Sequence, residues 1–191
     1  MEEYRVSICP WVLGDSLLRE YHDTEWGVPC HDDTMLFELL CLEGAQAGLS
    51  WLTILKRREG YRKAFRNFSI PACAALTDDE LEEIRLHGDV IRNRLKIAAV
   101  RKNARVVQEI QQEFGSFDAY VWHFTEGKQI RNAWSDQRDM PAQSELSEHI
   151  SRDLKKRGAS FVGPVIMYSF LQAVGVLNDH IASCPCGDGA Y

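Results

Sequence analysis

Soft metal ligands gather near the C-terminus of the sequence. His180, Cys184 and Cys186 lie within seven residues, and thiolates with imidazole are ligands that suit zinc. Because three residues do not complete a closed tetrahedral site, further ligands must come from elsewhere in the chain. The candidates are thiol and imidazole groups nearer the N-terminus: Cys9 with His22, or Cys30 with His31. Two other interpretations stay open, namely unpaired buried thiols and a Cys–His nucleophile, although no local feature marks an activated thiolate.

Glu43 is a carboxylate within an apolar helical stretch. At helical spacing it shares a stripe with Leu36 and Leu40, and a carboxylate on a buried face must be paired, hydrogen-bonded or functional. Several aromatic residues could line a pocket with it: Trp51, Tyr21, Trp11 and Trp26. The same pattern also fits structural aromatics and a Glu43 side chain that turns to solvent.

A glycine-bearing hairpin, residues 158–165, is a candidate phosphate-binding segment. It follows Lys155, Lys156 and Arg157 and leads into a helix that Pro164 can begin. Free N–H groups at such a helix start can receive a phosphate. The basic residues fit a solvated helix C-terminus equally well, because cations interact favourably with that end of the dipole.

The elements that must position these residues are helices. Apolar spacing is helical almost throughout, and no long alternating run or Asn-Gly turn indicates a sheet, so we expect an all-α fold. The predicted helices are 33–47 with a cap at Asp33 or Thr34 and a stop at Gly48, 77–88 with a Thr77/Glu80 capping box, 90–113 ending near Gly115, 117–124, 144–158 with Ser144 as cap, and 164–175. The polar segment 126–143 is predicted to be a loop.

Length and composition indicate one domain, residues 1–191, without a membrane segment. Lys plus Arg total 22 against 28 Asp plus Glu, and a net charge of −6 excludes a uniformly basic nucleic-acid coat. Any nucleic-acid contact must therefore come from local patches. The uncharged stretch 158–178 contains polar residues, glycine and proline, which favours a buried core helix. The N-terminal residues lack a basic segment followed by an apolar run, so we expect a cytoplasmic protein without a disulfide framework.

Three groups of residues carry a family resemblance. They are Cys9-Pro10-Trp11 with YHDTEWGVP at 21–29, CLEGAQAGLSWLTILKRRE at 41–59, and LKKRGASFVGPVIMYSFLQAVGVLNDH at 154–180 followed by Cys184. From about residue 9 to residue 184 the chain resembles the 3-methyladenine DNA glycosylase I family, least so at 106–148. The resemblance implies an all-α helix-hairpin-helix DNA glycosylase fold. It also implies one structural zinc ion per chain that joins the two terminal segments, at about 9–22 and 180–184.

The resemblance also assigns roles to single residues. The implied zinc ligands are Cys9, His22, His180 and Cys184, with Cys186 left over and Asp179 beside the site. The implied catalytic residue is Glu43, with Trp51, Tyr21 and Trp11 binding the substrate. The implied DNA-binding residues are the wedge Gly48 and Leu49 and the hairpin residues Gly158, Gly163 and Pro164, to which Lys155, Lys156 and Arg157 add positive charge. Pro164 stands where related sequences often carry Thr, and it lacks one backbone donor.

The activity that the resemblance implies is hydrolytic excision of 3-methyladenine from alkylated double-stranded DNA. Because the alkylated base is cationic and departs neutral, recognition by a buried carboxylate and a stacking tryptophan can do most of the work. No lysine is positioned as a Schiff-base nucleophile, so we expect a monofunctional enzyme that leaves an abasic site. We also expect the protein to be a monomer. The alternative is a non-catalytic, zinc-stapled DNA-binding or lesion-sensing module, and the presence of both Glu43 and Trp51 argues against it.

Overall fold

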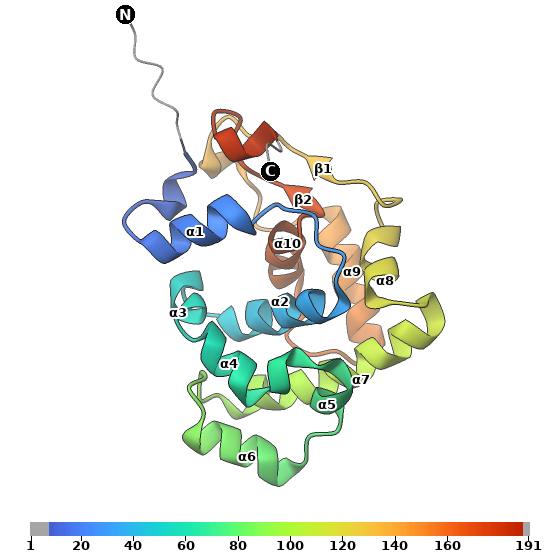
Figure 1. Cartoon of the computed structure of the whole chain (residues 1–191). Coiled ribbons are helices and arrows are strands. Elements are labelled where there is room, and N and C mark those ends of the chain that lie inside the picture. Colours follow the sequence, from blue (N-terminus) through green and yellow to red (C-terminus); the bar gives the residue numbers. More distant parts are fainter. Residues whose placement is uncertain (1–7, 189–191) are drawn as a thin grey trace, which may run out of the picture.

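The computed structural model describes residues 8–188, and helices form nearly all of its regular structure (Figure 1). The α-helices are α1 Ser16–Thr24, α2 Asp33–Gln46, α3 Trp51–Leu55, α4 Arg58–Ala64, α5 Ile70–Ala74, α6 Asp78–His87, α7 Arg94–Phe114, α8 Phe117–His123, α9 Glu145–Lys156 and α10 Pro164–Ala173. The short 3₁₀ turns are η1 Pro10–Val12, η2 Arg66–Phe68, η3 Gln137–Asp139 and η4 Pro185–Asp188. Within residues 8–188 no helix is both long and apolar enough to cross a membrane.

Helix α2 runs through the middle of the molecule and is buried on every side (Figure 1). Every residue from 36 to 45 is buried, because α10, α7, α8 and α3 pack around the helix. The sequence pattern predicts an apolar stripe on one face of this helix, whereas the structure buries all of its faces. As a consequence, Glu43 is inside the protein and only 4% exposed, and its side chain does not turn to solvent.

Side-chain caps define several helix starts. The Thr77/Glu80 capping box that opens α6 is present, and Ser144 caps α9, as predicted. The cap of α2 is instead Asp32, one residue before the predicted cap, and its carboxylate accepts the Met35 N–H at 2.8 Å. An aspartate one position earlier meets the geometry of an N-cap, whose side chain bonds to the third residue of the helix.

Helix α7 begins four residues later than expected. Asn93 is its N-cap and accepts the N–H groups of Leu95 and Lys96, so the helix starts at Arg94 and not at Val90. Val90 is buried although it lies outside the helix, and apolar spacing alone cannot separate such a loop residue from a first helical turn. The predicted end is confirmed, because Gly115 follows α7 with a φ of +90°.

The predicted loop 126–143 contains a short strand and a 3₁₀ turn. Strand β1, Ile130–Arg131, pairs in parallel with β2, Leu177–Asn178, which directly follows α10. This two-residue pairing ties the loop to the end of α10 and places η3 over the same end of the molecule. The expectation of an essentially helical fold is confirmed, with this one small sheet as an addition.

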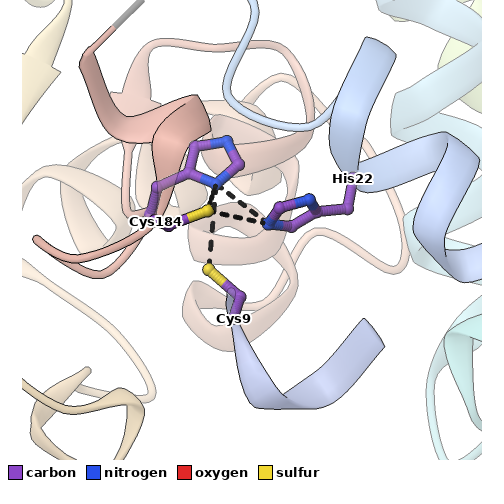
Figure 2. Close-up of side chains that lie close together, drawn as sticks. Cys9, His22 and Cys184 are labelled. Atoms are coloured by element: carbon purple, nitrogen blue, oxygen red, sulfur yellow. Dashed lines mark hydrogen bonds between the residues drawn. The ribbon is translucent and has the colours of Figure 1, made fainter. Parts of the chain in front are cut away.

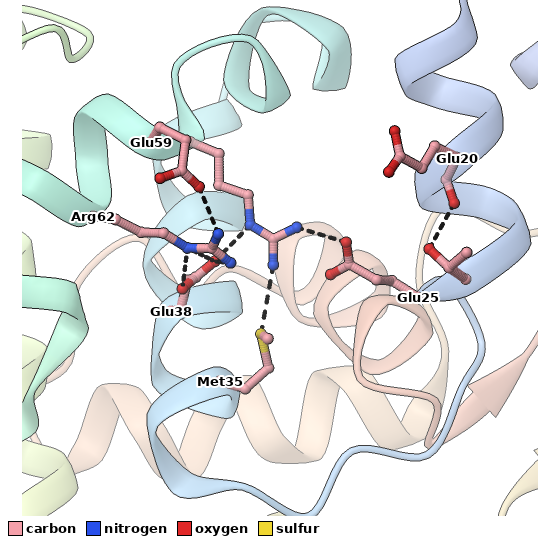
Figure 3. A network of polar contacts seen from close by, with 8 residues as sticks. Glu20, Glu25, Met35, Glu38, Glu59 and Arg62 are labelled. Carbon is pink, nitrogen blue, oxygen red and sulfur yellow. Dashed lines mark hydrogen bonds and ion pairs between the residues drawn. The ribbon is translucent and has the colours of Figure 1, made fainter.

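A buried ion-pair network fixes α1 against α2 and α4 (Figure 3). Arg58 donates from Nε to Glu38 Oε1 at 2.5 Å and from Nη1 to Glu25 Oε1 at 2.8 Å. Arg62 adds bonds to both carboxylate oxygens of Glu38, at 2.8 to 3.1 Å. Because Glu25 caps the end of α1, the network sets the position of α1 relative to the middle of α2.

Candidate active site and metal centre

A cavity of about 200 Å³ opens between η1, α1, α2, α3, α10 and the 126–143 loop. Its lining combines aromatic and polar side chains: Trp11, Tyr21, Trp26, Glu43, Gln46, Trp51, Gln137, Met140, Ser169 and Gln172. This volume is below the roughly 300–1,000 Å³ typical of drug-sized ligands, so the cavity suits a ligand about the size of one heterocyclic base.

Aromatic rings form the walls of this pocket. The Tyr21 and Trp51 ring centroids lie 5.3 Å apart at 54°, and Trp11 contacts the edge of Tyr21 with centroids 6.4 Å apart. Trp51 is the first residue of α3, where the Ser50 N-cap holds the backbone, and Tyr21 comes from α1. The pocket can therefore offer flat apolar surfaces to a planar ligand.

Three polar atoms of the pocket are buried without a hydrogen-bond partner among the described residues. They are the Glu43 Oε2 atom, the Tyr21 hydroxyl and the Trp51 Nε1 atom. Burial alone raises the pKa of Glu43 to about 8. The pKa of Tyr21 is also raised, mainly by burial and to a smaller extent by the negative charge of Glu43. Unsatisfied buried polar groups cost free energy in the empty protein, and a ligand with complementary polar atoms would remove that cost.

The four residues predicted to handle the base, Glu43, Trp51, Tyr21 and Trp11, thus share one pocket. Sequence analysis missed several other lining residues: Gln46, Ser169, Gln172, Gln137 and Met140. Gln46 lies one turn after Glu43, and Ser169 and Gln172 are polar residues three positions apart in an apolar helix, so helical spacing could have found these three. Gln137 and Met140 belong to the 126–143 loop, where the sequence has no periodic pattern that could predict a contact with the pocket.

A second group of residues could hold a metal ion (Figure 2). Cys9, His22, His180 and Cys184 are all buried, and their four ligand atoms lie within 4.8 Å of one another. Cys184 Sγ is 3.6 Å from His22 Nε2 and 3.6 Å from His180 Nδ1, and the two nitrogens are 3.0 Å apart. These separations approximate the edges of a tetrahedron with zinc–ligand distances of about 2.0–2.3 Å.

The hydrogen bonds of the two imidazoles fit a metal ion between them. His22 Nδ1 lies 2.7 Å from Asp23 Oδ1, and His180 Nε2 lies 3.0 Å from the Trp26 carbonyl oxygen. Because carboxylate and carbonyl oxygens only accept, these two nitrogens carry the protons, and the lone pairs of His22 Nε2 and His180 Nδ1 face each other. Burial lowers the pKa of both imidazoles, that of His180 to about 4, which keeps them neutral. A cation coordinated by both nitrogens would remove this repulsion between lone pairs.

Of the two N-terminal pairs that the sequence offered as further ligands, the structure brings Cys9 and His22 to His180 and Cys184. Cys30 and His31 lie outside this cluster, and His31 Nδ1 is 2.8 Å from Asp118. Cys186 also lies outside the four-residue cluster, with its Sγ 3.8 Å from Asp23 Oδ1. None of the six cysteines, each of which the structure describes, forms a disulfide.

Asp179, which directly precedes the candidate ligand His180, is held by several side chains. The outer partners of the imidazoles are Asp23 and the Trp26 carbonyl, as described above. Asp179 instead accepts hydrogen bonds from four side chains: Asn132, Trp134, Tyr168 and Gln172, at 2.6 to 2.9 Å. Four donors from the loop and α10 therefore hold this carboxylate beside the candidate ligand His180.

Trp26 connects the metal cluster to the pocket. Its ring lies 4.7 Å from His180 and 5.9 Å from His22, and it packs on Trp11 at 5.1 Å between centroids. The four cluster residues join the N-terminal segment to the C-terminal segment at one end of the molecule (Figure 1). The cluster thereby holds η1 and α1, which carry Trp11 and Tyr21, beside the pocket.

The predicted DNA-binding glycines and Leu49 lie at the protein surface. Gly48 has a φ of +79°, a backbone conformation that favours glycine, and Leu49 beside it is 39% exposed. Gly158 also has a positive φ, and Gly163 is the N-cap of α10 with Pro164 as the first helical residue. A Cβ atom added to any of these three glycines would meet no other atom within 4 Å, so a ligand can approach their backbone.

The three basic residues before the hairpin differ in their surroundings. Lys155 and Lys156 are exposed. Arg157 instead pairs with Glu113 at 2.6 Å and with Asp153 at 2.7 Å, and its side chain is 20% exposed. Its charge is balanced by these two carboxylates, so the two lysines are the better candidates for attracting phosphate.

Comparisons with known proteins agree with this geometry. The profile of the methyladenine glycosylase family matches residues 11–187. A DNA-3-methyladenine glycosylase from Haemophilus influenzae is 42% identical over 93% of this chain and 96% of its own length. A crystal structure of 3-methyladenine DNA glycosylase I superposes with a TM-score of 0.91 at 43% identity, covering 94% of this chain and 99% of that one. A variant of 3-methyladenine DNA glycosylase I in complex with 3-methyladenine has a TM-score of 0.90 at 34% identity, covering 93% and 95% of the two chains.

Proposed function

This chain belongs to the methyladenine glycosylase family, and from that premise we propose how its pocket carries out the family's reaction. The protein is a DNA repair glycosylase that flips 3-methyladenine out of alkylated DNA and excises it by hydrolysis, leaving an abasic site. The proposal concerns the residues that do this, the metal ion that supports them, and the protein's action as a monomer.

The observation that carries the proposal is the set of three unpartnered polar atoms inside an aromatic pocket. Adenine alkylated at N3 is a flat cation with hydrogen-bond donors and acceptors on its edge. Trp51 and Tyr21 supply surfaces for stacking, which a cationic ring strengthens. Glu43 supplies a carboxylate, whose negative charge favours the alkylated base over normal adenine.

Glu43 acts by recognition and charge complementarity. In the empty pocket burial disfavours its ionised form, and a cationic base beside it favours that form again. The alkylated base already carries the positive charge that a general acid would otherwise provide, so it leaves as a neutral molecule when the glycosidic bond breaks. Water then attacks the sugar carbon. No lysine lines the pocket among residues 8–188, in keeping with a reaction that forms no Schiff base.

The surface segments bring the DNA to this pocket. Leu49 is the wedge that occupies the space left by the flipped nucleotide, and residues 158–164 bind the backbone phosphates through N–H groups at the start of α10. Lys155 and Lys156 add a local positive field to a chain of negative net charge.

Zinc is the ion that suits the cluster of two thiols and two imidazoles. Cys9, His22, His180 and Cys184 would hold it, and with four protein ligands it would have a structural role. The ion would stabilise the junction of the two terminal segments, and the base-excision chemistry is assigned to the pocket.

Release of free base tests the proposed function directly. Wild-type protein incubated with methylated DNA should release 3-methyladenine, detected by chromatography, and leave alkali-labile abasic sites without cutting the strand itself. A matched incubation with unmethylated DNA of the same sequence should release no adenine. Stoichiometric binding to methylated DNA without base release would instead assign the protein to the class of lesion-sensing modules.

A further inference from the structure

The turn that carries Leu49, residues 47–50, is supported by a lysine from another helix. Helix α2 ends at Gln46 with no basic residue in its last turn. Lys96, at the start of α7, donates from Nζ to the Ala45 carbonyl oxygen at 2.8 Å and to the Ala47 carbonyl oxygen at 2.6 Å. The last carbonyls of a helix lack intrahelical partners and carry partial negative charge. This ammonium group therefore serves as a charged C-cap that another helix of the same chain supplies.

The rest of the 47–50 turn is also held by hydrogen bonds. The Leu49 N–H donates to the Gln46 carbonyl at 2.6 Å, and Ser50 accepts the Thr53 N–H as the N-cap of α3. The Leu49 side chain, in contrast, is 39% exposed and extends from this fixed backbone. Loss of the Lys96 bonds would release the carbonyls that precede Gly48, the residue whose positive φ allows the turn.

Asn103 supports the hairpin from the same helix. Its side-chain amide donates to the Ser160 carbonyl at 2.9 Å and accepts the Ser160 N–H at 2.8 Å, and Asn103 is only 3% exposed. Asn103 lies seven residues after Lys96, two helical turns or about 10 Å further along the same face of α7. One rigid helix thus contacts both surface segments that we assign to DNA.

The geometry points to Lys96 as a positioning residue for nucleotide flipping. Lys96 sets the position of Leu49 relative to the 158–165 hairpin. This inference rests on the proposed function, specifically on the role of Leu49 as the wedge. Lys96 contacts neither the pocket nor the reacting atoms, so it acts through the backbone of the 47–50 turn.

Direct binding of Lys96 to a DNA phosphate is the competing explanation. Both recorded contacts of its ammonium group are carbonyl oxygens, and burial lowers the pKa of this lysine. A phosphate-binding lysine would weaken binding to all duplexes alike and reduce the salt dependence of affinity by about one unit of slope. A positioning lysine should leave both quantities close to those of the wild type.

The test is a double-mutant cycle on single-turnover release of 3-methyladenine from methylated duplex DNA. Lys96→Met, which keeps the aliphatic stem, should slow release roughly tenfold, because a charge-assisted support of the turn is lost. Lys96→Arg, which retains a cation able to donate to two carbonyls, should recover most of the rate. Lys128→Met is the control, since the Lys128 side chain is 79% exposed and pairs with an exposed glutamate, Glu126.

Coupling to Leu49 separates positioning from a general structural effect. In a Leu49→Ala background, Lys96→Met should slow the release of 3-methyladenine little further, because the side chain that Lys96 positions is already absent. Affinity for free 3-methyladenine, followed by tryptophan fluorescence, should equal that of the wild type in every variant. An equal cost of Lys96→Met in both backgrounds, or a loss of free-base affinity, would overturn the inference. If Leu49→Ala itself releases base at the wild-type rate, the wedge role in the proposed function fails instead.

Discussion

At the scale of single residues, the buried environment of Glu43 lowers the stability of the fold and at the same time suits the carboxylate to a cationic base. Among residues 8–188 no group hydrogen-bonds to its buried Oε2 atom, and burial is the cause of its raised pKa. A protein selected only for stability would place an apolar residue here, because an unsatisfied buried carboxyl group destabilises the fold. The same lack of a partner makes the carboxylate available to a cationic base.

The first prediction concerns catalysis by Glu43. Glu43→Gln keeps the shape of the side chain and removes its charge, so release of 3-methyladenine from methylated DNA should fall by roughly 10- to 1,000-fold. The fold should persist, which circular dichroism can verify. Quenching of tryptophan fluorescence by free 3-methyladenine should also weaken, as it should in Trp51→Ala. Release at the wild-type rate would show that Glu43 is a structural residue.

The second prediction concerns stability and pH. Glu43 has a pKa of about 8 in the folded protein against an ordinary value of 4.5, so its neutral form is favoured by folding. Its contribution to stability is fully present below pH 4.5 and is lost as the pH rises to 8, because the unfolded chain ionises first and binds fewer protons. Glu43→Gln should therefore gain stability over the wild type between these values, by a few kcal/mol at most. Urea unfolding at pH 5 and pH 9 measures the difference in unfolding free energy between Glu43→Gln and the wild type. An equal difference at both pH values would refute a raised pKa of Glu43.

At the scale of elements, two local capping signals were predicted correctly from the sequence, those of α2 and α7 were misplaced, and the packing of distant elements was not predictable from periodicity. The Thr77/Glu80 capping box and the Ser144 cap each depend on side chains within three residues, so the sequence is sufficient to find them. The full burial of α2 depends on four other helices, and no period within α2 reveals it. Gln137 and Met140 reach the pocket because their loop is tied down by β1–β2 pairing, a contact between residues 47 positions apart in sequence (130 and 177).

The third prediction separates the roles of the basic residues at the end of α9. Reversing Lys155 and Lys156 to Glu should weaken binding to undamaged duplexes of any sequence and lower the salt slope of the affinity by up to about two. Arg157→Glu should instead destabilise the fold by about 1–3 kcal/mol, because Arg157 pairs with Glu113 and Asp153 and lies over the rings of Phe114 and Tyr120. Fluorescence anisotropy and urea unfolding of both variants measure the two effects. Unchanged affinity of the lysine variant at low salt would remove this segment from the DNA interface.

At the scale of the whole molecule, the cluster of Cys9, His22, His180 and Cys184 brings two distant parts of the chain together. Cys9 and His180 are 171 positions apart in sequence, and their side chains lie 3.8 Å apart. A metal ion bound there would link these distant positions, and the stability gained by closing a loop grows slowly with the length of that loop. Because Trp11 and Tyr21 line the pocket and lie in the N-terminal segment that carries Cys9 and His22, the proposed base site depends on the same junction.

The last prediction follows from that junction. The purified protein should contain about one zinc ion per chain, measured by metal analysis. Cys9→Ser and His180→Ala should lose the ion and several kcal/mol of stability, because a structural site contributes to folding. Cys186→Ser is the matched control, since Cys186 lies outside the four-residue cluster, and it should retain the metal. Removal of zinc with a chelator should lower the unfolding midpoint of the wild type and of Cys186→Ser alike, and should change Cys9→Ser little. Retention of zinc in Cys184→Ser with loss in Cys186→Ser would show that the other thiol is the ligand.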